Sequence, residues 1–156
     1  MKQDVVPVEI RGILPSPSGA AIFIGNDQKV FVIQVEPNMG MVIGMFLRDA
    51  PKERPLTHDL VKSVFEAFGI TVEWVIITEL RNSTYYARLI LQQQNELGRK
   101  IVEVDSRPSD SLALAVAHKK SIYVTTSLFE QVEDMSELLE RYNQGDSGES
   151  GDSEEA

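Results

Sequence analysis

The sequence predicts an α+β fold built from a duplicated βββα-type unit, with a mixed or antiparallel sheet and helices packed on it. Two runs of three strand-like segments occur, and each is followed by a turn that opens a helix rich in small residues. The two halves share this order of elements with almost no residue identity, which indicates an internal repeat. Consecutive antiparallel strands argue against a doubly wound parallel sheet.

The first half is predicted to be a three-stranded meander followed by a helix. Apolar and β-branched segments at 5–13, 20–24 and 30–35 indicate the strands, and the proline-rich segment 15–19 breaks the first of them. The turn 36–38 opens a helix predicted over 39–47. Gly40 and Gly44 are four residues apart in it, so another backbone can approach one face of this helix closely.

The second half begins with an amphipathic helix that Thr57 can cap and that ends at Gly69. The next strands are predicted at 72–80, 85–92 and 100–105. A helix then runs from the turn 107–110 to His118. A short strand at 122–125 and a frayed helix over 127–142 follow.

Residues 1–132 are therefore predicted to form one domain, residues 133–142 a helical extension, and residues 143–156 a disordered acidic tail. With 42% hydrophobic residues in a chain of 156, a core can form without disulfides or a metal. The segment 143–156 consists mainly of Gly, Ser, Asp and Glu, which cannot offset the entropy cost of ordering. The tail keeps the protein soluble or, alternatively, acts as a partner-binding or autoinhibitory arm.

Composition excludes several classes of protein. There is no cysteine, which excludes disulfides, thiol nucleophiles and Cys-ligated metals. No apolar run has the length of a leader or a membrane span, so a cytoplasmic protein without membrane contact is expected. The net charge of −9 argues against coating nucleic acid by counterion release, although the five acids of 143–156 account for much of that charge.

The absence of the common cofactor-binding motifs excludes most organic cofactors. Dinucleotide, Walker, zinc-protease and serine-hydrolase motifs are all absent from the sequence, so no organic cofactor is expected. With only two histidines, one chain cannot form a multi-histidine metal centre. A carboxylate site for Mg²⁺ or Mn²⁺ remains open.

The first candidate site is the segment 54–59, where Arg54, Thr57, His58 and Asp59 lie within six residues at a helix start. The unpaired amides and the positive dipole at such an end attract anions. Arg54 and these amides can hold a phosphate while the imidazole of His58 moves a proton. The alternative is structural: Thr57 caps the helix, and Arg54 pairs with Asp59 to fix its entrance.

The second candidate site, 105–111, repeats this chemistry with Asp105, Arg107, Ser109 and Asp110 around another helix start. Two carboxylates brought together here can hold a divalent cation against a phosphodiester. The alternative is again structural, with capping of the helix and an Arg107–Asp110 ion pair.

Taken together, the motifs RPLTHDL at 54–60 and DSRPSDSLALA at 105–115 closely resemble the bifunctional nuclease domain family. YYARL at 85–89 and IYV at 122–124 fit the same family, and the resemblance covers about residues 5–132. It implies a duplicated α+β domain that acts on RNA and DNA, with Mg²⁺ or Mn²⁺ as the expected cofactor. On this chain it implies that the catalytic residues are His58, Asp59 and Asp110. The phosphate-binding residues would be Arg54, Thr57, Arg107 and Ser109. The metal-binding residues would be Asp105 and Asp110.

One position departs from the family pattern. A Glu-Ala pair usually opens the first helix, but this chain has Met39 there, and Glu36 is the only acid nearby. The departure keeps a rival interpretation open, in which the domain is a non-catalytic binding or regulatory module and the Arg-Pro motifs only lock the fold. Edge strands and the Gly40/Gly44 face also predict a homo-oligomer.

Overall fold

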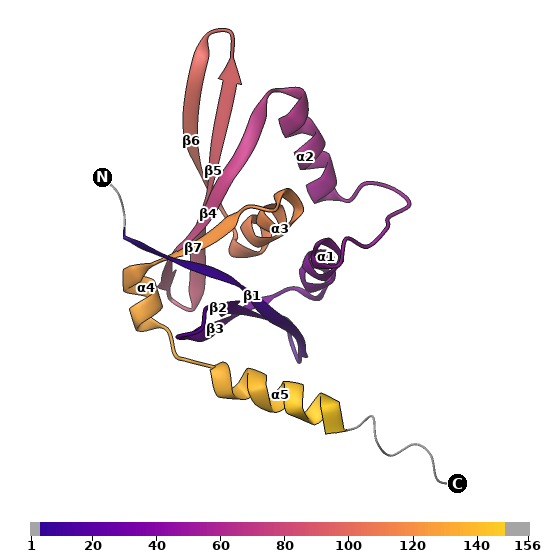
Figure 1. Ribbon diagram of the computed structural model, residues 1–156, viewed down its shortest axis with the longest axis vertical. Coiled ribbons are helices and arrows are strands. Elements are labelled where there is room, and N and C mark those ends of the chain that lie inside the picture. The colour runs from indigo at the N-terminus through magenta and orange to yellow at the C-terminus, as the bar shows by residue number, and fades with distance from the viewer. Residues whose placement is uncertain (1–3, 149–156) are drawn as a thin grey trace.

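The computed structural model describes residues 4–148 as a mixed seven-stranded sheet with helices packed on it (Figure 1). This confirms the predicted α+β class. The strands are β1 (Val5–Ser16), β2 (Gly19–Gly25), β3 (Val30–Val35), β4 (Ile70–Arg81), β5 (Thr84–Asn95), β6 (Gly98–Ser106) and β7 (Ser121–Thr125). The helices are α1 (Pro37–Leu47), α2 (Thr57–Ala67), α3 (Pro108–His118), α4 (Thr126–Gln131) and α5 (Ser136–Gly148).

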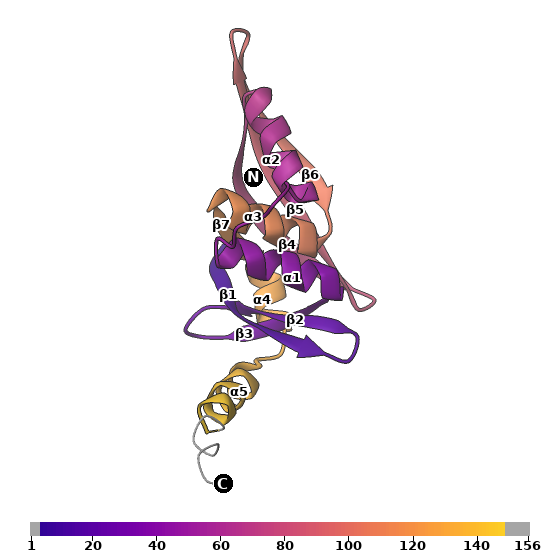
Figure 2. The same ribbon diagram turned by 90° about the vertical axis from the view of Figure 1, so that its right-hand side faces the viewer.

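The strand order is β3-β2-β1-β7-β4-β5-β6, so the two predicted meanders lie on either side of β7. β7 runs parallel to β4, and the other neighbouring strands are antiparallel. β1 pairs with β7 over Val5–Val8 and with β2 from Glu9 onward. Figure 2 shows that the first meander runs across the direction of the second. The duplication itself stays a prediction.

Helix α3 lies at the centre of the molecule because almost all of it is apolar and small. Leu112, Ala113 and Ala115 are fully buried, and α3 packs against α1, α2, β4 and β5. α1 approaches β2 closely at Gly40, where a Cβ atom would lie 2.4 Å from the Cβ of Ala20. This confirms the predicted close approach at Gly40. Gly44 instead faces only the side chain of Arg48.

Three predicted boundaries are wrong. β1 continues through Pro15, which lies opposite Ala20, because β1 has no partner on its other side beyond Val8 and a missing N–H is tolerated there. The cap of α2 is Leu56, and Thr57 is the first helical residue. The predicted helix over 127–142 is two helices, since the chain is not helical from Val132 to Met135.

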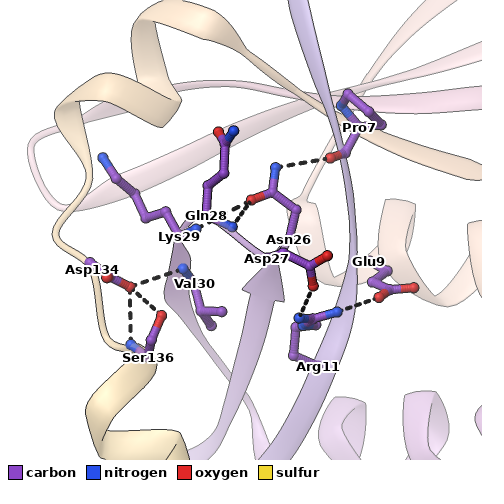
Figure 3. A network of polar contacts seen from close by, with 10 residues as sticks. All are labelled: Pro7, Glu9, Arg11, Asn26, Asp27, Gln28, Lys29, Val30, Asp134 and Ser136. Atoms are coloured by element: carbon purple, nitrogen blue, oxygen red, sulfur yellow. Dashed lines mark hydrogen bonds and ion pairs between the residues drawn. The ribbon is translucent and has the colours of Figure 1, made fainter.

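The linker between α4 and α5 is fastened to the first residue of β3 (Figure 3). The Val30 N–H donates to Asp134 Oδ1 at 3.1 Å, and the Met135 N–H donates to the Val30 carbonyl at 2.6 Å. Asp134 also accepts from the Ser136 N–H at 3.0 Å, at the start of α5. α5 is thereby held against the first meander, where Leu139 packs in a cluster with Phe23 and Val30.

Helix α5 continues to Gly148 and so includes the first residues of the predicted acidic tail. The remainder of that tail, 149–156, lies outside the described residues. Among residues 4–148, no helix is both long and apolar enough to span a membrane.

Candidate active site

The two predicted sites meet at a contact between His58 and Asp110. His58 lies in the first turn of α2 and Asp110 in the first turn of α3, and His58 Nε2 is 2.9 Å from Asp110 Oδ1. His58 is only 8% exposed, with the ring of Phe46 against it at 6.4 Å in an edge-on arrangement. Within residues 4–148, the other ring nitrogen, Nδ1, forms no hydrogen bond. The ring is therefore fixed through one nitrogen, and the second is left without a partner.

Arg107, the N-cap residue of α3, extends this contact to a third helix. Its Nε donates to Asp110 Oδ2 at 3.0 Å, and its Nη1 lies 3.3 Å from Oε1 of Glu36, the N-cap residue of α1. His58, Asp110, Arg107 and Glu36 thus form one polar chain across the starts of α1, α2 and α3. We call these four residues the entrance cluster.

The charges of the entrance cluster are set by its ion pairs. Burial raises the pKa of Asp110, but hydrogen bonds from Arg107 and His58 outweigh this effect, and the pKa is lowered overall. The hydrogen bond to Asp110 raises the pKa of Arg107. At neutral pH the cluster therefore contains an ionised carboxylate and an ionised guanidinium in contact.

A cleft of about 340 Å³ lies beside the entrance cluster. It is bounded by the end of β3, the β4–β5 turn and the start of α3, and its lining is Ile33, Gln34, Val35, Glu36, Ser83, Thr84, Tyr85, Arg107, Pro108 and Ser109. Arg107 and Glu36 belong both to the lining and to the entrance cluster, whereas His58 and Asp110 lie behind them. Predicted residue Ser109 is 8% exposed and also lines the cleft.

Glu36 is the member of this cluster to which no role could be assigned from the sequence. It is separated from Arg107 by 71 positions, so no local pattern connects the two. The signals were its position directly before the proline that starts a helix and its being the only acid near Met39, where the family has a glutamate.

Asp59, by contrast, has a structural environment. Its Oδ2 accepts the Leu56 N–H at 2.8 Å, and its Oδ1 accepts from Lys52 Nζ at 3.0 Å. Burial raises the pKa of Asp59, but the hydrogen bonds from Lys52 and the Leu56 amide prevail and lower it. Asp59 thus fixes the start of α2, and its partner is Lys52, not the expected Arg54.

Arg54 and Thr57 also lie away from the entrance cluster. Arg54 lines a separate hollow of about 400 Å³ together with Lys52 and Asp59. Among the described residues, Arg54 forms no hydrogen bond or ion pair. Thr57 is exposed on the first turn of α2. Of the first motif, the structure brings only His58 to the second.

The carboxylates of the second motif do not form a metal site within one chain. Asp105 lies on β6, opposite Arg88 of β5. The hydroxyl of the next residue, Ser106, contacts the hydroxyl of Ser111 in α3. Because side chains alternate along a strand, Asp105 points to the other face of the sheet from α3 and Asp110. No group of three metal-ligating side chains occurs in the described part of the chain. Asp105 and Asp110 are therefore not brought together as ligands of one metal ion within a single chain.

The sequence profile of the bifunctional nuclease domain matches residues 22–137, which include the whole entrance cluster. The chain belongs to the bifunctional nuclease domain family. An uncharacterized protein of Mycobacterium tuberculosis is 30% identical to this chain over 106 residues, which cover 68% of this chain and 60% of the relative. Bifunctional nuclease 1 of Oryza sativa subsp. indica is 33% identical over 101 residues, covering 64% of this chain and 30% of the rice protein.

The chain thus spans 60% of the mycobacterial relative and 30% of the rice relative. The match to the bifunctional nuclease domain ends at residue 137, so nearly all of α5 lies beyond it.

Proposed function

We propose that this protein is a nuclease that hydrolyses phosphodiester bonds of RNA, DNA or both in the cleft beside the entrance cluster. The observation that carries the proposal is the position of Arg107, which lines the cleft and also contacts Asp110, the partner of His58. A cleft that ends on an arginine at a helix N-terminus suits a phosphate, because the guanidinium and the unpaired amides both favour an anion.

In the proposed reaction, Arg107 and the amides at the start of α3 hold the scissile phosphate, with Ser109 beside them. Water attacks phosphorus, the bond from phosphorus to the leaving oxygen breaks, and the leaving oxygen takes up a proton from solvent water. Asp110 holds the Nε2–H of His58, so that Nδ1 can accept the proton of the attacking water through a second water, because His58 does not itself line the cleft. Asp59 has no part in this scheme because its oxygens are engaged at the start of α2.

No step of this scheme passes through a metal ion, since Asp105 and Asp110 lie apart within one chain. Dependence on Mg²⁺ or Mn²⁺ stays a prediction of the sequence. It is measured by comparing cleavage in EDTA with cleavage after either ion is added back.

The test of the proposal is an assay of the purified chain on labelled single-stranded RNA and DNA. Cleavage by the natural sequence is expected, together with a loss of at least about tenfold in Arg107→Gln. Arg11→Gln is the matched control, because Arg11 also forms two carboxylate ion pairs but lies away from the cleft. Equal losses in the two variants would refute the role of Arg107.

A non-catalytic binding or regulatory module is the second candidate function. It is favoured by the two ion pairs that Arg107 forms within the protein, with Glu36 and Asp110, as expected of a fold lock. In that case Arg107→Gln lowers the melting temperature, and the natural chain binds nucleic acid without cutting it.

We also propose that the chain associates with itself, as the open strand at one edge of its sheet suggests. A cytoplasmic location stays a prediction of the sequence.

A further inference from the structure

Strand β6 forms one edge of the sheet, and its charges are separated by sign along its length. Arg99 and Lys100 lie near its start, whereas Glu103 and Asp105 lie near its end. All four residues are exposed. Within residues 4–148, none of the four forms an ion pair. The strand therefore carries two unpaired cations and two unpaired anions in separate halves.

The opposite edge of the sheet, β3, differs from β6 because another segment partly covers it. The linker before α5 bonds both the N–H and the carbonyl of Val30. No strand of the described chain lies beyond β6. Two of its apolar side chains, Ile101 and Val104, are 51% and 39% exposed. A nine-residue open strand of this kind is a template for pairing with another chain.

We propose that β6 pairs antiparallel with β6 of a second copy of this chain, with the basic half of each strand against the acidic half of the other. A two-fold axis at Val102 places Arg99 opposite the partner's Asp105, and symmetry repeats the pair. Opposite charges that face each other across an antiparallel pair stabilise it. The inference rests on the proposed self-association and names its surface.

Charges on an edge strand more often prevent pairing with another chain. The order of the charges along β6 decides whether they prevent pairing or direct it. In a parallel, in-register alignment of two copies, Arg99 meets Arg99 and Asp105 meets Asp105, which is repulsive. In the antiparallel alignment Arg99 faces Asp105 of the second copy at both ends of the pair, whereas Lys100 faces Val104 and Glu103 faces Ile101. The sequence of charges thus disfavours a parallel pair of β6 strands and favours an antiparallel, two-fold pair.

The pairing also bears on the candidate active site. β6 ends at Ser106, directly before Arg107, so a second strand bonded to β6 stiffens the segment that positions Arg107. It also gives Asp105 an ion-pair partner, Arg99 of the second copy.

The test uses the full chain in sedimentation equilibrium at micromolar concentration, with circular dichroism to verify folding. The natural chain is expected to be a dimer. The double variant Arg99→Glu/Lys100→Glu makes β6 acidic throughout, and Glu103→Lys/Asp105→Lys makes it basic throughout. Each should raise the dissociation constant at least about tenfold, and an equimolar mixture of the two variants should recover dimers.

The matched control is Lys120→Glu/Arg141→Glu, which makes the same change of net charge as the acidic β6 variant at exposed residues outside β6 and should stay dimeric. A monomeric natural chain would overturn the self-association and this inference together. A dimer that both β6 variants leave intact would overturn the β6 surface alone. Neither result affects the nuclease proposal, which the cleavage assay tests separately.

Discussion

His58 Nε2 lies 2.9 Å from Asp110 Oδ1, across 52 positions of sequence, and this contact joins the first turns of α2 and α3. Arg107 and Glu36 extend it to the start of α1. Three helices therefore begin around one polar chain, and substitutions in this chain should affect both stability and chemistry.

Asp110→Asn should lower stability in a pH-dependent way. Because the pKa of Asp110 is lowered in the folded protein, its stabilising contribution is present above the unfolded pKa of about 4 and is lost as pH falls through the folded value. The side chain is 33% exposed, so the expected cost at neutral pH is only about 1 kcal/mol. Urea unfolding of both proteins from about pH 7 down to about pH 3 measures it. A difference that does not change with pH would contradict the ionic origin of the effect.

Asp59→Asn should cost stability without abolishing cleavage. The variant weakens the hydrogen bond to the Leu56 amide and the ion pair with Lys52, which together contribute about 1 kcal/mol. Thermal melts and cleavage rates at a temperature where both proteins are folded separate the two effects. A large loss of rate with an unchanged melt would instead assign Asp59 to catalysis.

Gly40→Ala should destabilise the protein by about 1–3 kcal/mol through overpacking. The added Cβ atom would lie 2.4 Å from the Cβ of Ala20, which is held in β2 between β1 and β3. Gly44→Ala is the control, because its Cβ atom meets only the flexible end of Arg48 at 3.2 Å. Replacing that glycine favours the helix by up to about 1 kcal/mol. Similar melting temperatures for the two variants would show that α1 does not approach β2 as described.

Leu139→Ala should lower the free energy of unfolding by about 2 kcal/mol or more, because Leu139 is buried against Phe23. Leu138→Ala, at a side chain that is 49% exposed, should change it by less than about 0.5 kcal/mol. Denaturant titrations of the two variants provide the comparison. Equal, small effects would mean that α5 does not stabilise the first meander.

Local patterns predicted most of the fold but only part of the site. Strand alternation, turn residues and the apolar face of α2 were sufficient to place the two meanders and the helices after them. The cap of α2 was misplaced because Asp59, at the third helical position, accepts the N–H of Leu56 and so fixes Leu56 as the N-cap residue, with Thr57 already inside the helix. The break before α5 depends on hydrogen bonds to Val30, more than a hundred positions away, and no local signal reports them.

The same distinction between local and distant contacts explains which contacts of the candidate site were predicted from the sequence and which were not. The Arg107–Asp110 pair is local and was foreseen as an alternative, and the structure contains it. The contacts of His58 with Asp110 and of Arg107 with Glu36 depend on how α1, α2 and α3 pack. Asp105 was grouped with Asp110 by nearness in sequence, although strand alternation turns it to the other face of the sheet.

The most direct test of the central claim is the cleavage rate of His58→Gln on single-stranded RNA and DNA. The variant is expected to fold, since a glutamine amide at this position can still donate to Asp110. The amide cannot accept and release the proton of the attacking water, however, because it does not titrate near neutral pH. With an unchanged melt, a loss of at least about a hundredfold is predicted. A His58→Gln variant that cuts as fast as the natural chain would contradict the account.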